Sequence, residues 1–254
     1  MKIASVCAAV VLAMLALCIQ SASAKDAPSG AERTLLQLAN RERAAQGLAP
    51  LKWSAALAEA ARDHALRLAQ QNTLSHQLPG EAKLAERAAR AGARFSSIAE
   101  NVAEGPSAKD IHQQWMHSAP HRANLLDEEL DSMGVAVADR NGTLFAVEDF
   151  SLAVDDVSIH DQERMVEGQL KERGLRLLSY TEDARRSCVL DNGYAGSHQP
   201  SFVVHYATPD LQVLPDMLEK RIRTGKYHSA VVGACPSDAK FGFSSHRVAV
   251  LLFE

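Results

Sequence analysis

Two histidines and one glutamate are the side chains in this sequence with the best chemistry for a shared site. His76 follows a predicted helix, Glu100 precedes Asn101, and His121 comes directly after Pro120. Neutral imidazoles are zinc ligands, and Glu100 would act as a third ligand, as the partner that orients one imidazole, or as a general base. With two imidazoles as ligands, we expect modest metal affinity that falls as they protonate below about pH 6.5.

The other histidines are weaker candidates. We expect His64 and His112 to be exposed on helices, and Pro120 interrupts the i, i+4 relation between His117 and His121. Four more show no ligand-like spacing: His198, His205, His228 and His246. The sequence has no glycine-rich phosphate loop, GxSxG elbow or HExxH motif, so the enzyme classes that use them gain no support.

Amphipathic helices must carry these side chains into place. Apolar residues at three-to-four spacing predict helices over about residues 31–46, 55–71, 82–91 and 108–119. Ser54 and Ser107 are suitable N-caps for the second and fourth, and Gly47 ends the first. The second helix therefore delivers the chain directly to His76.

A change of period after these helices indicates a β-hairpin. Met133 to Val137 is predicted as one strand and Leu144 to Val147 as the returning strand. Between them, Asn141-Gly142 is the dipeptide preferred in tight two-residue turns. Helices followed by an antiparallel hairpin predict a layered α/β/α or α+β domain.

Several short stretches together resemble the CAP superfamily, which includes cysteine-rich secretory proteins, antigen 5 and plant pathogenesis-related proteins. They are Leu38 to Arg43, Leu51-Lys52-Trp53, Leu74-Ser75-His76, Ile98 to Val102, Trp115 to Leu126 and Met133 to Val137. They follow one another in the order of that superfamily. The resemblance covers Ala31 to Phe150 and nothing beyond.

The resemblance implies an α/β/α sandwich with a large cleft holding two histidines and two acidic residues. His76 and His121 match the histidines, which would bind zinc or another divalent cation, and Glu100 matches one acid. The position of the second acid is occupied by Ser118, as in the bacterial branch. The expected binding cleft is therefore His76, Glu100, Ser118 and His121, and any mechanism that needs two acids is weakened.

Residues 1–24 have the order of a secretory signal peptide: Lys2, an apolar run to Ile19, and a small-residue cleavage site at Ala22-Ser23-Ala24. A retained membrane anchor is the alternative, although about 17 apolar residues are few for a bilayer span. We expect cleavage after Ala24, no membrane span in the remaining chain, and a secreted or periplasmic protein. The domains would then be residues 31–154 and 155–254.

The second domain is predicted as a small α+β unit of unknown role. Its expected helices are Val157 to Arg173 and Leu211 to Arg223, and its expected strands are Ser201 to Tyr206, Ala230 to Cys235 and Arg247 to Phe253. Cys188 and Cys235 remain after signal cleavage, and an even number of cysteines in an exported chain predicts a disulfide between them. No internal repeat is detectable in the residues.

The function is expected to be binding. The formal net charge of −4 does not indicate a basic surface for binding nucleic acid. The resemblance implies an extracytoplasmic ligand such as a lipid, a peptide or an envelope component. Two alternatives stay open: a metal-assisted, protease-like hydrolase with Glu100 as base, and a C-terminal unit that binds the partner while the first domain carries it.

Overall fold

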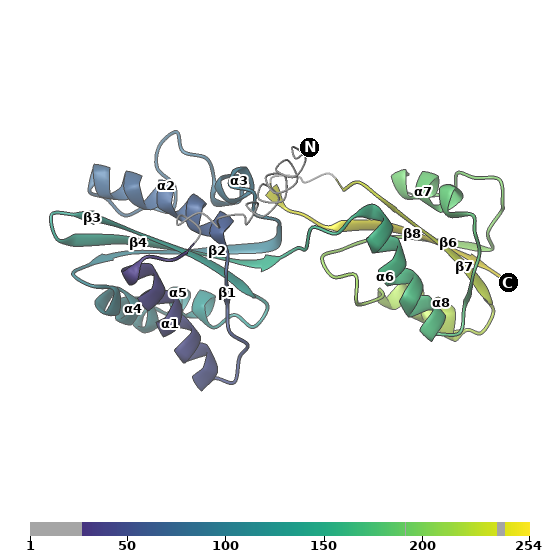
Figure 1. Cartoon of the computed structure of the whole chain (residues 1–254), viewed down its shortest axis with the longest axis horizontal. Helices are drawn as coiled ribbons and strands as arrows, with labels where there is room; N and C mark the ends of the chain where they lie inside the picture. The colour runs from purple at the N-terminus through teal and green to yellow at the C-terminus, as the bar shows by residue number, and fades with distance from the viewer. Residues whose placement is uncertain (1–26, 191, 238–241) are drawn as a thin grey trace, which may run out of the picture.

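The computed structural model describes residues 27–190, 192–237 and 242–254, so the expected signal peptide lies outside the described residues. The chain forms two four-stranded sheets, each with its own helices (Figure 1). The α+β class and the α/β/α arrangement of the first part are thereby confirmed. No helix in the described part of the chain is long and apolar enough to cross a membrane.

The first sheet contains β1 (Lys52–Trp53), β2 (Phe95–Gly105), β3 (Ser132–Arg140) and β4 (Thr143–Ala153). Its order is β1-β3-β4-β2, with β1 parallel to β3 and the other pairs antiparallel. The helices are α1 (Gly30–Ala45), α2 (Ala55–Gln71), α3 (Leu84–Arg90), α4 (Ala108–His117) and α5 (Ala119–Leu125). The sheet lies between α2 and α3 on one face and α1, α4 and α5 on the other (Figure 1).

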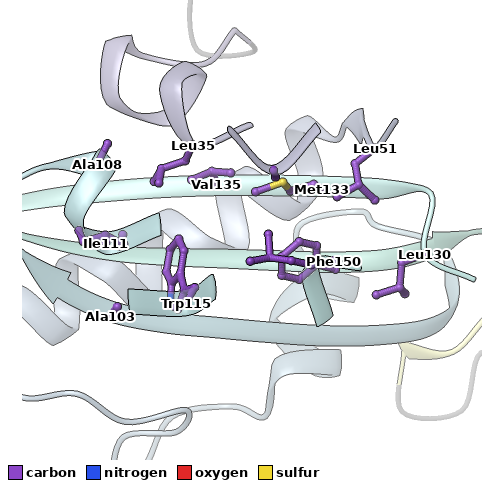
Figure 2. Packing of buried hydrophobic residues seen from close by; sticks show 13 residues of the cluster. Leu35, Leu51, Ala103, Ala108, Ile111, Trp115, Leu130, Met133, Val135 and Phe150 are labelled. Carbon is purple, nitrogen blue, oxygen red and sulfur yellow. The ribbon is translucent and has the colours of Figure 1, made fainter. Parts of the chain in front are cut away.

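Strand alternation divides the core into two layers. On the α1/α4 face, Leu35 and Trp115 pack against Val135 and Phe150 (Figure 2). On the α2 face, a separate apolar cluster includes Ala61 and Ala136. Because successive residues of a strand point to opposite faces, neighbouring residues of β2 and β4 serve different layers.

Local signals explain most of the element boundaries. The Ser54 side chain accepts the Leu57 N–H and caps α2. Ser118 separates α4 from α5, because Pro120 lies in the first turn of α5 and cannot continue the preceding helix. Asn141 and Gly142 both have positive φ, as a tight two-residue hairpin turn requires.

The second sheet contains β5 (Arg176–Leu177), β6 (Phe202–Thr208), β7 (Ser229–Cys235) and β8 (His246–Phe253) in the order β5-β7-β8-β6. Its helices are α6 (Ile159–Glu172), α7 (Thr181–Val189) and α8 (Asp216–Arg223). The predicted helix from Leu211 is wrong in its first turn, because α8 begins only after Pro215. Cys188 and Cys235 form the expected disulfide.

The two halves touch where the residues just before β8 reach the start of β2 (Figure 1). Ser244 N–H donates to the Phe95 carbonyl at 2.7 Å, and the Phe95 and Phe243 rings meet edge to face. A side chain at Gly242 would collide with Ala85 in α3. Gly242 therefore lies directly against α3, the helix that follows the His76 loop.

Candidate functional site

His76 and Glu100 are in direct contact. His76 lies in the loop between α2 and α3, and Glu100 projects from the middle of β2 toward the same face of the sheet. His76 Nδ1 is 2.8 Å from Glu100 Oε1. The imidazole is 60% exposed whereas the carboxylate is 3% exposed. The hydrogen bond that Glu100 accepts from His76 outweighs partial burial and raises the pKa of His76 above its ordinary value.

Arg87 of α3 occupies the other side of the Glu100 carboxylate. Its guanidinium donates to Glu100 Oε2 and to the carbonyls of His76 and Ala82. Both Glu100 oxygens are therefore engaged by cationic or protonated partners. Of the three roles open to Glu100, this geometry favours orienting His76 through Nδ1, which leaves Nε2 as the nitrogen available to a ligand.

His121 approaches the same strand from the other face of the sheet. The Asn101 side-chain amide donates to the His121 carbonyl at 3.1 Å, and the Asn124 amide donates to the Glu100 carbonyl at 3.2 Å and to Asn101 Oδ1 at 2.9 Å. β2 is an edge strand and α5 lies against it, and His121 is near enough to His76 for its charge to act on His121. Partial burial, and then the nearby charge of His76, lower the pKa of His121.

Ser118 lies at the junction between α4 and α5 and is half-buried. Its N–H donates to the carbonyls of Gln114 and Trp115, both at 3.1 Å, so its backbone ends α4. The side chain makes no capping hydrogen bond to α5. His117, one residue earlier, is exposed and bonds the Gln113 carbonyl through Nδ1.

The expectation that His64 and His112 are exposed is wrong. His64 is fully buried, with Nδ1 hydrogen-bonded to Glu81 and Nε2 2.8 Å from the Ser75 carbonyl. It therefore braces the loop that carries His76. His112 is also buried, against α1, and this burial lowers its pKa.

A position within the apolar stripe of α2 is the sequence signal that predicts the burial of His64. His64 lies at helical spacing from Ala61 and Leu68 on that face. Glu81 completes the arrangement from the loop before α3. Burial alone would raise the pKa of Glu81, but the Leu78 N–H and His64 together lower it.

Two buried acids of β4 support the site and could not be singled out from the sequence. Asp149 is paired with Glu100 across the β2–β4 ladder, and Glu148 is paired with Asn101. Both carboxyl groups are fully buried. Burial raises the pKa of both well above the usual value, and for Asp149 the neighbouring Glu100 charge adds to the effect. Burial therefore disfavours the charged form of both carboxyl groups.

The donor set for a metal is limited to imidazole nitrogens. Among the described residues, no group of three or more histidine, cysteine, aspartate or glutamate side chains is arranged to hold a metal ion. Glu100 is already bound to His76 and Arg87. An ion at this site would therefore rest on His76 and His121, with water or a bound ligand completing its coordination.

Comparison with known proteins gives a family for this part of the chain. Residues 36–150 match the cysteine-rich secretory protein family, abbreviated CAP. Two Bacillus subtilis proteins are similar to this chain. "Uncharacterized protein YkwD" is 30% identical over 44% of this chain and 44% of its own length. "Uncharacterized membrane protein YlbC" is 31% identical over 44% of this chain and 33% of its own length. The aligned region thus spans less than half of either relative.

A solved structure with similarity to this chain is that of a Bacillus anthracis extracellular protein containing an SCP domain. It shares 29% identity over 48% of this chain and 40% of its own, with a TM-score of 0.45. The family match coincides with the first sheet and its helices, including His76, Glu100, Ser118 and His121. The part of this chain that contains the candidate site, residues 36–150, is therefore similar to the cysteine-rich secretory protein family.

Proposed function

We propose that this chain is an exported binding protein whose CAP domain takes an extracytoplasmic ligand at a site that His76 and His121 form with a divalent metal ion. The observation that carries the proposal is the contact between His76 Nδ1 and Glu100, which fixes the ring and turns Nε2 to the accessible side. The apolar leader in the sequence supports export. A lipid, a peptide or an envelope component is the ligand class that the family resemblance favours.

The residues present fit a metal ion of modest affinity. His76 and His121 would hold it, and Glu100 would orient one imidazole from behind. When bound, zinc would polarise a water or an oxygen of the ligand. Arg87 neutralises Glu100, so the carboxylate keeps its place whether or not a cation is bound.

Binding is better supported than hydrolysis. A general base must be within reach of a water proton, but both oxygens of Glu100 are engaged. Ser118 stands where relatives with two acids would have the second. A protease-like hydrolase that uses His76, His121 and Glu100 is thus the second candidate, and turnover of a peptide or ester panel that is lost in Glu100→Gln would favour it.

Zinc titration of the purified mature chain by calorimetry tests the proposal. We expect saturable binding of one ion, lost in the His76→Ala/His121→Ala double variant and retained in His117→Ala, a matched change at an exposed histidine outside the site. Zinc affinity that is unchanged in the double variant would overturn the metal site. A pull-down of envelope lipids and peptides with both proteins then tests whether ligand capture depends on it.

A further inference from the structure

A cavity of about 390 Å³ lies between α2, α3 and the loop that joins them. It is distinct from the candidate site, because the described residues that line it do not include His76, Glu100, Ser118 or His121. Its volume falls within the range of small-molecule pockets, about 300–1,000 Å³. Its charged lining residues are Glu59, Asp63, Glu81, Arg67, Arg87 and Arg90.

The charges stand in order along two helices that lie side by side on one face of the first sheet (Figure 1). Glu59, Asp63 and Arg67 follow one another at four-residue spacing on one face of α2. Arg67 is 3.8 Å from Glu81, which lies just before α3. At the other end of the cavity, the first turns of α2 pack against the last turn of α3. The helices are therefore antiparallel, and Arg90 of α3 lies toward the Glu59 end.

Three of the charged side chains have no close partner. Asp63 makes no hydrogen bond or ion pair with another described residue. Arg67 and Arg90 each reach an acid only at 3.8 Å, which is too long for a hydrogen bond. The other three are already paired: Glu59 with Arg62, Glu81 with His64, and Arg87 with Glu100. One acid and two cations thus remain available to a ligand.

Arg87 adds an unsatisfied donor to the wall of the cavity. Its side chain is 6% exposed, and its Nη atoms donate to Glu100 and to the carbonyls of His76 and Ala82. Its Nε–H has no hydrogen-bond partner within the described part of the chain, although buried donors normally have one. Arg90 follows three residues later on the same helix. The α3 wall therefore offers two guanidinium groups on neighbouring turns.

We infer that this cavity binds a short peptide with free termini, whose carboxylate lies beside Arg87 and Arg90 and whose ammonium lies beside Asp63. Guanidinium groups form strong charge-assisted hydrogen bonds with carboxylates, and the Asp63 carboxylate accepts from an ammonium. A simple anion would face Asp63 and Glu59, and a simple cation would face three arginines. A ligand that carries both charges satisfies both walls. The inference does not depend on metal binding at the histidine pair.

Calorimetric titration of the mature, full-length chain with the dipeptide alanyl-alanine tests the site. We expect saturable binding at millimolar concentration or below. The N-acetylated dipeptide lacks the ammonium, and the C-amidated dipeptide lacks the carboxylate. Each capped form should bind about tenfold more weakly than the free dipeptide, because one charge-assisted contact is lost.

Two substitutions assign the two ends of the peptide. Asp63→Asn should weaken binding of the free dipeptide about tenfold and leave binding of the N-acetylated form unchanged, since that form has no ammonium to lose. Arg90→Gln should weaken binding of the free dipeptide and leave binding of the C-amidated form unchanged. Glu128→Gln and Arg41→Gln, at exposed residues outside the cavity, are the matched controls and should bind like the unmodified chain.

Three outcomes would overturn the inference: no saturable binding at millimolar dipeptide, equal affinity for the free and capped forms, or unchanged affinity in both Asp63→Asn and Arg90→Gln. Thermal unfolding of each variant confirms that the fold is retained before affinities are compared. The His76→Ala/His121→Ala variant should keep its dipeptide affinity, and loss of binding there would assign the peptide to the histidine site instead. Failure of the metal site and failure of this cavity therefore give different results.

Discussion

Arg87 donates to the same buried carboxylate of Glu100 that holds His76. Removing the guanidinium leaves Glu100 buried without its strongest partner, so Arg87→Met should lower the free energy of unfolding by about 3–5 kcal/mol. Combining it with Glu100→Gln should cost less than the sum of the two single changes. Urea unfolding measures this, and Arg90→Met, at an exposed arginine of the same helix, is the control with an expected effect below about 0.5 kcal/mol.

The raised pKa of His76 should depend on Glu100. In Glu100→Gln the carboxylate that favours the imidazolium is gone, so the pKa of His76 should fall toward or below its ordinary value. An NMR titration of the His76 ring protons measures the shift. His117, which bonds only a backbone carbonyl, is the internal reference.

The same contact has a stability consequence with a definite sign. Because the pKa of His76 is raised on folding, its stabilising contribution is complete below the unfolded pKa of about 6.5 and is lost as pH rises through the folded pKa. Exposure of the imidazole keeps the contribution small. A titration of His76 that is identical in Glu100→Gln would contradict both statements.

Glu148 should make the fold sensitive to rising pH. It keeps its proton when folded because burial raises its pKa, whereas the unfolded side chain ionises near its ordinary value. Stability is therefore lost as pH rises above the unfolded pKa, by about 1.4 kcal/mol per pH unit, until the folded pKa is reached. Unfolding free energies across mildly acidic to neutral pH should decline less steeply in Glu148→Gln, and parallel slopes would refute this.

Gly134 and Gly233 should be equally intolerant of a side chain. Alanine at either position would push a strand away from the helix backbone that touches it, at a cost of about 3 kcal/mol, the upper end of the usual cost of overpacking. Gly168→Ala is the opposite case, because the space around this glycine of α6 is open, and it should stabilise by about 0.5–1 kcal/mol. Thermal unfolding ranks the three variants, and a mild effect at only one of the two strand glycines would argue against equivalent packing.

Much of the first sheet was predictable because its signals are local. Ser54, Ser107 and the Asn141-Gly142 turn act within a few residues, and the structure uses all of them. The strand around Glu100 was not assigned from the sequence because its residues do not alternate clearly between polar and apolar types. As an edge strand flanked by α3, α4 and α5, β2 is defined by its ladder to β4.

The residues that support the site could not be predicted from local sequence patterns. Arg87 and Asp149 reach Glu100 only through tertiary packing, and no spacing in the sequence relates them. The exposure predicted for His64 is wrong because Arg62 and Asp63 directly before it suggest a polar face, whereas its helical spacing from Ala61 and Leu68 puts it on the apolar face of α2. The matching strand orders of the two sheets, β1-β3-β4-β2 and β5-β7-β8-β6, were equally hidden, since the two sheets share an arrangement of strands and not a pattern of residue types.

Asn124 gives its amide to the outward carbonyl of Glu100, on the free edge of β2. An open strand edge invites pairing with strands of other molecules, and proteins protect such edges with helices or side chains. The short helix that presents His121 therefore also shields the chain from aggregation at this edge. A substitution that detaches α5 from β2 should lower both solubility and ligand affinity. The same short helix therefore serves both edge protection and ligand binding.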